Sequence, residues 1–343
     1  MTSTPARHVE IIGGGLAGLS LGLALRRAGV PVSILEAGAY PRHRVCGEFI
    51  TGLSSDTIDR LGLAPFLADA RSHREVTWFL RGHPLRRQIL PQPALALSRH
   101  ALDQRLADAF IAVGGDLRTQ TRVDLNAAPA GRVFATGRRP DRPEWIGLKC
   151  HAFNLPLTTD LALHLGDHAY VGLCAVEGGR VNVSGLFRQL DGLDVSRDTA
   201  LFTYLRASGL ETLADRLAAA DIDPVSFSAV AGLGFSKPAV ESNLLVIGDT
   251  YAMTPPFTGN GMAMAFQSAE QALDPLLAWS RNATTWEETV RTVHLRLRTL
   301  FRVRLASAAT LHPFLLKPAR QRWLAGASRF GLLPVRPLYH ATH

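Results

Sequence analysis

A glycine-rich turn near the start of the chain constrains the fold more than any other feature. Gly13, Gly15 and Gly18 fit the pattern GxGxxG, directly after the short apolar run at residues 8–12 and at the start of a helical run at 16–28. A β-rich run at 32–35 follows and completes a βαβ unit. In this motif the first glycine makes a tight turn, the second lets the backbone approach a pyrophosphate, and the third packs helix against strand. The pattern predicts a dinucleotide-binding domain.

An acidic residue lies where this motif needs one. Glu36 follows the second strand, 18 residues after Gly18. A carboxylate there accepts hydrogen bonds from adenosine ribose hydroxyls and repels a 2′-phosphate. The amides of Leu16 and Ala17 open the helix and face the anion. The alternative is a plain glycine turn followed by a chance glutamate.

A second glycine motif lies far along the chain, after the buried β-rich run 243–247. Gly248 and Asp249 follow that run, and residues 256–261 (PFTGNG) open a long apolar helix at 262–279. The Asp249 carboxylate can accept from a sugar hydroxyl, and glycines let backbone amides approach a ring edge. The helix start favours negative charge on that ring. The alternative for Asp249 is an ordinary turn or helix cap.

The two motifs in this order resemble the FAD-dependent oxidoreductase superfamily of aromatic hydroxylases and geranylgeranyl reductases. In that superfamily Gly-Asp binds the ribitol chain, and Pro-x-x-Gly-x-Gly begins seven residues after the Asp, as Pro256 does here. The resemblance implies non-covalently bound FAD. It assigns these cofactor-binding residues: Gly13, Gly15, Leu16, Ala17, Gly18, Glu36, Arg44, Arg99, Gly248, Asp249, Gly259, Asn260, Gly261 and Met262.

Three shorter stretches refine this resemblance. Arg99 opens a segment similar to the superfamily's arginine-bearing helix, and Arg44 lies where hydroxylases often place an arginine beside the mobile flavin ring. Cys46, followed by glycine, resembles the geranylgeranyl reductases. Thr136-Gly137 stands where hydroxylases usually carry Asp-Gly, which questions direct NADPH use. No catalytic residue can be named, but Arg44, Cys46 and Pro256 are candidates beside the flavin.

The predicted fold is α/β, with a glutathione-reductase-like, Rossmann-type FAD-binding domain and an inserted antiparallel β-sheet substrate domain. The FAD-binding domain is expected at 1–74, 99–145 and 236–285. The β-rich runs of the substrate domain occupy 75–98 and 146–235, with a helix near 197–220. A basic helical C-terminal segment is expected at 286–343.

The charge of the chain is concentrated in that C-terminal segment. Residues 289–343 contain nine Arg, one Lys and no acidic residue, whereas the remaining chain carries 27 basic and 29 acidic residues. Val290, Val293, Leu297, Leu300 and Phe301 recur at helical spacing, which predicts an amphipathic helix. We expect it to pack on the body, with weak contact to an anionic membrane surface as the alternative.

Other partners and sites are not predicted. No basic patch with stacking aromatics or known module suggests nucleic-acid binding. Three cysteines without CxxC spacing argue against zinc or a disulfide framework, so no metal is expected and a cytoplasmic location is favoured. No apolar run approaches the ~20 residues of a membrane span, so we expect a soluble chain.

The expected activity is that of an FAD-dependent monooxygenase. Its substrate would be an apolar aromatic, polyketide or lipid-like small molecule, its co-substrate O₂, and its electron donor NADH or NADPH without a binding domain of its own. A flavin-dependent double-bond reductase of the geranylgeranyl reductase type is the first alternative. A non-catalytic binding protein on the same fold is the second.

Overall fold

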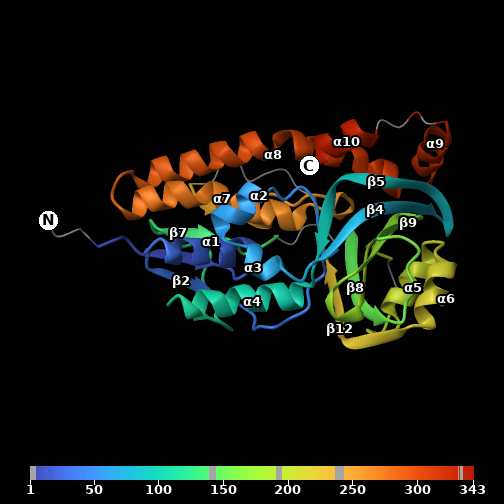
Figure 1. The fold of residues 1–343 in the computed structure, drawn as a ribbon, viewed down its shortest axis with the longest axis horizontal. Helices are drawn as coiled ribbons and strands as arrows, with labels where there is room; N and C mark the ends of the chain where they lie inside the picture. Colours follow the sequence, from blue (N-terminus) through green and yellow to red (C-terminus); the bar gives the residue numbers. More distant parts are fainter. Residues whose placement is uncertain (1–4, 139–143, 191–194, 236–242, 331, 333–334) are drawn as a thin grey trace.

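The computed structural model describes residues 5–138, 144–190, 195–235, 243–330, 332 and 335–343. Two sheets divide the molecule into a dinucleotide half and a sheet half, which lie side by side (Figure 1). The helical C-terminal segment runs along one side of both halves. The predicted α/β class, with its Rossmann-type half and its second sheet, is confirmed.

A five-stranded parallel sheet forms the centre of the dinucleotide half. Its strands lie in the order β13-β7-β1-β2-β6, and every neighbouring pair is parallel. The strands are β1 (Val9–Ile12), β2 (Val32–Leu35), β6 (Asp116–Arg118), β7 (Arg132–Phe134) and β13 (Leu245–Val246). Parallel strands buried on both faces need covering helices. These are α1 (Leu16–Arg27), α4 (Arg99–Ala112) and α7 (Gly261–Ser280), of which α1 contacts the other two.

The sheet half is built on eight strands in the order β12-β8-β11-β10-β9-β4-β5-β3. Their bounds are β3 (Phe49–Ile50), β4 (Arg71–Leu80), β5 (His83–Ala96), β8 (Trp145–Phe153), β9 (Leu161–Gly166), β10 (Ala169–Ala175), β11 (Val181–Arg188) and β12 (Asp221–Ala231). All pairs are antiparallel except β4 with β9, so the sheet is mixed and not purely antiparallel as predicted. The two parallel strands come from distant parts of the chain. β4 belongs to the early β4–β5 hairpin, and β9 belongs to the run of strands that follows later in the sequence.

Helices cover the outer face of the larger sheet. The single helix expected near 197–220 is two helices, α5 (Ala200–Ala207) and α6 (Glu211–Ala218). Gly209 separates them with a φ of 70°, a backbone conformation that glycine adopts without strain. Short helices α2 (Ser55–Leu61) and α3 (Ala64–Leu67) follow β3 in the sequence and precede β4, and they contact helices of the dinucleotide half.

Strand boundaries differ from the domain boundaries that we predict. β4 begins at Arg71 and β3 already pairs with β5, so the sheet recruits residues from before position 75. The predicted return to the FAD-binding domain at residue 236 lies outside the described residues. The division into two discontinuous domains therefore stays a prediction.

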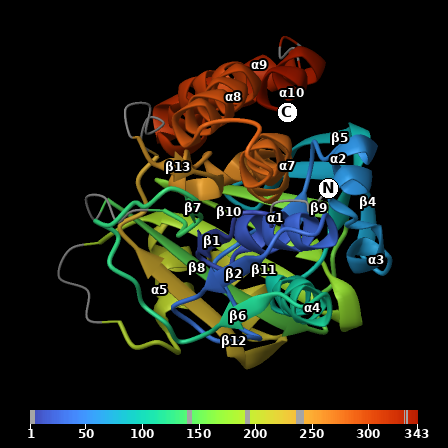
Figure 2. The same ribbon diagram turned by 90° about the vertical axis from the view of Figure 1, so that its left-hand side faces the viewer.

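The C-terminal segment is helical, with α8 (Trp286–Leu316), α9 (Pro318–Arg329) and α10 (Val335–Thr342). A capping box begins α8, in which the hydroxyl of Thr285 accepts from the amide of Glu288 and the Glu288 carboxylate accepts from that of Thr285. Figure 2 shows α8 above α7, on the side of the molecule away from α4. Val290, Val293, Leu297 and Phe301 are buried as expected. Leu300, which shares their spacing, is 37% exposed.

Among the described helices, none combines the length and the apolar composition that crossing a membrane requires.

Candidate active site

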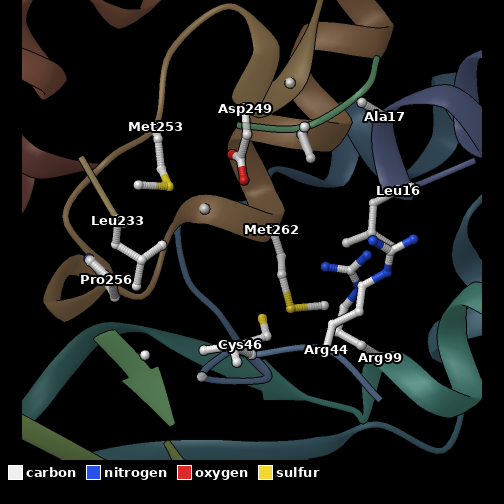
Figure 3. Close-up of a pocket in the computed structure, with 18 of the residues that line it drawn as sticks. Leu16, Ala17, Arg44, Cys46, Arg99, Leu233, Asp249, Met253, Pro256 and Met262 are labelled. Atoms are coloured by element: carbon white, nitrogen blue, oxygen red, sulfur yellow. The ribbon is translucent and has the colours of Figure 1, made fainter. Parts of the chain in front are cut away.

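A cavity of about 610 Å³ lies between the two halves and brings both glycine motifs together. Figure 3 shows Leu16, Arg44 and Arg99 at one end and Met253, Pro256 and Leu233 at the other, with Asp249 between them. Of the sequence-predicted residues, the following line it: Gly13, Gly15, Leu16, Ala17, Glu36, Arg44, Cys46, Arg99, Gly248, Asp249, Pro256, Gly259, Gly261 and Met262. Gly18 and Asn260 are not part of the lining.

The first glycine turn has the shape that a pyrophosphate site requires. Gly13 has a φ of +108°, and a Cβ there would overlap the Ala135 carbonyl. A Cβ on Gly18 would overlap the Gly13 carbonyl, so Gly18 serves helix packing. Gly15 has no neighbour within 4 Å of an added Cβ, and no side chain caps the start of α1. The first amides of α1 are therefore available to an anion in the cavity.

Glu36 lies at the end of β2 and is 5% exposed. Its carboxylate accepts from the amides of Gly14 (2.7 Å) and Gly38 (2.8 Å) and from Arg42 Nη2 (2.6 Å). Burial alone would raise the pKa of Glu36, but the Gly38 amide and the Arg42 guanidinium lower it. An ionised carboxylate has about four acceptor sites, so one remains for a ribose hydroxyl.

Two arginines share one buried carboxylate at this end of the cavity. Arg99 makes a bidentate contact with Asp103 (2.7 and 2.8 Å), and Arg44 Nε donates to the same carboxylate (3.1 Å). Arg44 Nη2 is buried without a hydrogen-bond partner in the described part of the chain, and lies 3.8 Å from Glu36. A phosphate oxygen would satisfy this donor.

Arg44 is the arginine that the resemblance places beside the mobile flavin ring. In the structure its guanidinium lies next to that of Arg99 and close to Leu16, at the opposite end of the cavity from Pro256 (Figure 3). Its carboxylate partners, Glu36 and Asp103, hold it there. Its role beside the flavin ring stays a prediction.

The second motif forms the middle of the cavity. Gly248 has a φ of 61° and its amide donates to Ser268 Oγ (2.9 Å). The Asp249 carboxylate points into the cavity (Figure 3), and its exposed surface faces that space. Because protein atoms surround it, burial raises the pKa of Asp249, and Arg99 offsets this only in part. Hydroxyl donors from a ligand would stabilise the ionised form.

The turn after Asp249 is held from outside the cavity. Asn260 is one of the residues expected to bind the cofactor; its side chain is fully buried and does not line the cavity. Its Nδ2 donates to the main-chain oxygen of Thr342 in α10, and its Oδ1 accepts from Thr258 Oγ1 (2.6 Å). Gly259, with a φ of 70°, and Gly261, at the start of α7, keep their faces open to the cavity. Met262 extends from α7 toward Cys46 (Figure 3).

Cys46 lies on the wall of the cavity that faces Met262 (Figure 3). Burial raises the pKa of its thiol, and the nearby Arg99 offsets this only in part. The main-chain oxygens of Cys46 and Gly47 accept from Asn182 Nδ2 at 3.1 and 2.9 Å. A thiol that stays protonated is a poor nucleophile.

A buried charged cluster fixes the loop that carries Cys46. Glu48 is fully buried and has a φ of 52°, and its carboxylate lies 3.2 Å from Lys149 Nζ and 2.6 Å from His151 Nε2. It also accepts from the Arg99 amide (3.0 Å). Burial alone would raise the pKa of Glu48, but the His151 hydrogen bond and Lys149 lower it. Lys149 Nζ also lies 3.2 Å from His43 Nδ1.

Sequence reasoning missed this cluster. Lys149 and His151 occupy alternate positions in the apolar run of β8, so both side chains face the dinucleotide half. Two polar residues on one face of an otherwise apolar strand were the available signal. Glu48, two residues after Cys46, gave no indication of its partners, since a distance of about 100 residues separates them in the sequence.

The far end of the cavity is apolar. Leu161, Leu163 and Leu233 from the sheet half face Met253 and Phe257, next to Pro256. Tyr170 also lines this end, and its buried hydroxyl oxygen accepts from the Phe257 amide at 3.2 Å. Burial raises the pKa of Tyr170. Its hydroxyl therefore stays protonated and is a potential hydrogen-bond donor to a ligand.

Sequence comparisons agree with these features. The family model described as the FAD binding domain matches residues 6–142. Menaquinone reductase of Mycobacterium tuberculosis (strain H37Rv) is 24% identical over 334 residues, covering 80% of this chain and 78% of that protein. Menaquinone reductase of Mycolicibacterium smegmatis is 28% identical over 132 residues, but the match spans only 37% of this chain and 32% of that reductase.

Two solved structures share the fold. HpxO of Klebsiella pneumoniae, complexed with FAD and uric acid, has a TM-score of 0.74 at 15% identity, covering 98% of this chain and 95% of HpxO. The p-nitrophenol 4-monooxygenase PnpA of Pseudomonas putida has a TM-score of 0.71 at 15% identity, covering 99% of both chains. Residues 6–142 of the chain thus match an FAD binding domain, and the whole chain shares the fold of these two proteins.

Proposed function

We propose that the protein is a monooxygenase that hydroxylates an apolar aromatic, polyketide or lipid-like small molecule. The observation that carries this proposal is the cavity, which continues from the glycine turn of α1 to an apolar end beside the turn that opens α7. The likeness in fold to the p-nitrophenol 4-monooxygenase supports it.

In this proposal the chain holds FAD along the whole cavity. The α1 amides and the unpartnered Arg44 Nη2 bind the pyrophosphate, and Glu36 accepts from the adenosine ribose. Asp249 accepts from ribitol hydroxyls, and the amides at the start of α7 face the flavin ring. Bound FAD would supply the redox chemistry, passing electrons to O₂ so that one oxygen atom enters the substrate and the other leaves as water.

The apolar end of the cavity would then position the substrate. Leu163, Leu233 and Phe257 desolvate an apolar ring or chain and exclude water from the reacting atoms. The Tyr170 hydroxyl can donate a hydrogen bond to a polar group of the substrate. NADH or NADPH would donate two electrons, so the reaction consumes substrate, O₂, one reduced nicotinamide and one proton.

An isotope experiment tests the proposal. The FAD-loaded protein is incubated with NADH or NADPH, ¹⁸O₂ and candidate substrates. One ¹⁸O atom in the product supports hydroxylation. Anaerobic turnover to a product two hydrogens heavier refutes it.

That second outcome belongs to the alternative function, a flavin-dependent double-bond reductase. Two observations favour it: both curated relatives described above are named menaquinone reductase, and Cys46-Gly47 resembles the geranylgeranyl reductases. Thr136 stands where the hydroxylases carry an Asp, which questions the direct use of NADPH. Reduction of the bound flavin under anaerobic conditions, measured with NADH and with NADPH separately, shows which nicotinamide donates electrons.

The surface of the C-terminal helices suggests a further partner. Arg291, Arg298 and Arg302 are exposed on α8 together with Leu295 and Val303, which are 65% and 58% exposed. Basic residues beside exposed apolar ones suit an anionic membrane surface. We include weak membrane contact in the proposal, alongside a cytoplasmic location, for which the three free cysteines are the argument.

A further inference from the structure

A second, smaller cavity of about 170 Å³ lies beside the flavin cavity, underneath the C-terminal helices. The strands β4 and β5 form its floor, with Val76 and Leu90 in the lining, and α8–α10 form its roof (Figure 1). Leu311 of α8 and Leu324 and Ser328 of α9 face it from the roof. It is therefore a separate space on the helical side of the sheet.

The two cavities share a wall. Phe49, Leu161, Leu163, Phe257 and Gly259 line both of them. Four of these residues contribute apolar side chains, which can change rotamer without moving a strand. A molecule at the apolar end of the flavin cavity can therefore extend into the smaller cavity when these side chains move, without a shift of the backbone.

The chemistry of the smaller cavity selects an apolar occupant. Arg86 is the only Asp, Glu, Lys or Arg among its described lining residues. At its edge His343 Nε2 lies 2.7 Å from Thr51 Oγ1 and 2.9 Å from the Thr258 main-chain oxygen. The buried hydroxyl of Tyr339, which also lines the cavity, has no hydrogen-bond partner among the described residues and could bind one polar group of a ligand. An apolar cavity of ~150 Å³ stays dry and accepts benzene, so this one has room for roughly six carbon atoms.

We propose that the smaller cavity binds the hydrocarbon tail of an amphipathic substrate whose reacting ring or double bond occupies the flavin cavity. This inference rests on the proposed function and narrows its substrate class to a polar or aromatic head with an apolar chain. The roof helices limit the length of hydrocarbon tail that the smaller cavity can bury, because Leu311, Leu324 and Ser328 line its roof.

A series of 4-alkylphenols, from methyl to octyl, tests the proposal by their perturbation of the absorbance of bound FAD. Each methylene that enters the cavity should tighten binding about fourfold, the ratio that corresponds to ~0.8 kcal/mol per buried CH₂. The gain should stop after about six carbons, when the cavity is full. Equal affinities across the series, or no perturbation with any member, would overturn the proposal.

Variants of the roof locate the tail. Ser328→Phe fills the cavity and should remove the chain-length dependence while leaving 4-methylphenol binding unchanged. Ala319→Phe adds the same ring to an exposed position of the same helix and should behave like the unaltered protein. Leu311→Ala enlarges the cavity and should move the plateau to longer chains, which provides a second test should Ser328→Phe lose FAD. A chain-length dependence that persists in Ser328→Phe and does not shift in Leu311→Ala would refute the site.

The same series separates this inference from the proposed function. Chain-length-dependent binding without ¹⁸O incorporation leaves the tail site standing and removes the monooxygenase. Hydroxylation of 4-methylphenol without any effect of chain length does the reverse.

Discussion

Replacing Lys149 by Met should lower the free energy of unfolding by about 3–5 kcal/mol, the usual cost of removing one partner from a buried ion pair. Lys149 and Glu48 are both fully buried, 3.2 Å apart, and no solvent can compensate the carboxylate that remains. Met matches most of the lysine side chain in length, so little cavity is created. Against a typical total of ~5–15 kcal/mol this is a large fraction.

The Glu48→Gln variant measures the other side of the pair. It leaves the Lys149 ammonium buried without its carboxylate, so its cost should be similar. In the double variant neither charge remains, and the total loss should fall short of the sum by about 0.5–3 kcal/mol, as expected for residues in contact. The same variants should weaken FAD retention, because Glu48 also fixes the Cys46 loop and accepts from the Arg99 amide.

Urea unfolding at a fixed excess of FAD, followed by flavin fluorescence and far-UV circular dichroism, measures these losses. Arg105→Met is the matched control. It removes an ion pair to Asp69 with a 2.5 Å separation, but both side chains are open to solvent, and less than ~1 kcal/mol should be lost. If Lys149→Met costs no more than Arg105→Met, the argument from burial is wrong.

Glu36→Ala and Asp249→Ala should each weaken FAD binding by about 1–3 kcal/mol, because sugar hydroxyls lose their acceptor; FAD titration of the apoprotein measures this, and full retention in both variants contradicts the assigned site. Burial lowers the pKa of His164 and of His312 to about 4. Between about pH 6.5 and pH 4 the unfolded chain therefore binds more protons than the folded protein, and stability should fall as the pH falls. His312→Leu should flatten that slope in urea midpoints collected from pH 7 to 4.5, and an unchanged slope would count against the assignment. The protein should sediment with anionic vesicles at low salt and less in Arg298→Glu; absence of binding at low salt leaves α8 as an ordinary packing helix.

The parts of the fold that the sequence predicted are those with local causes. GxGxxG, the helix after it and the strand ending at Glu36 lie within about 30 consecutive residues, so their geometry follows from glycine conformations and hydrophobic period alone. Asp249 and the turn that opens α7 were predicted for the same reason.

The parts that sequence reasoning missed depend on distant contacts. Glu48 meets Lys149 only because β8 packs behind the Cys46 loop, and Arg44 lies beside Arg99 because Asp103 pairs with both. Leu300 fits the apolar spacing of α8, but the helix rotates it past the edge of the contact with the body. No local pattern contains this information.

The interleaving of the two halves has a consequence for synthesis on the ribosome. Strand β1 emerges first, but β13, which completes its sheet beyond β7, is separated from it by more than 230 residues. The nascent chain can close neither the parallel sheet nor the cavity until α7 has left the exit tunnel. FAD capture is therefore a late event, and a chain that stalls or is cut before residue 262 should emerge without bound flavin, with the apolar face of α1 uncovered and open to chaperones or proteases.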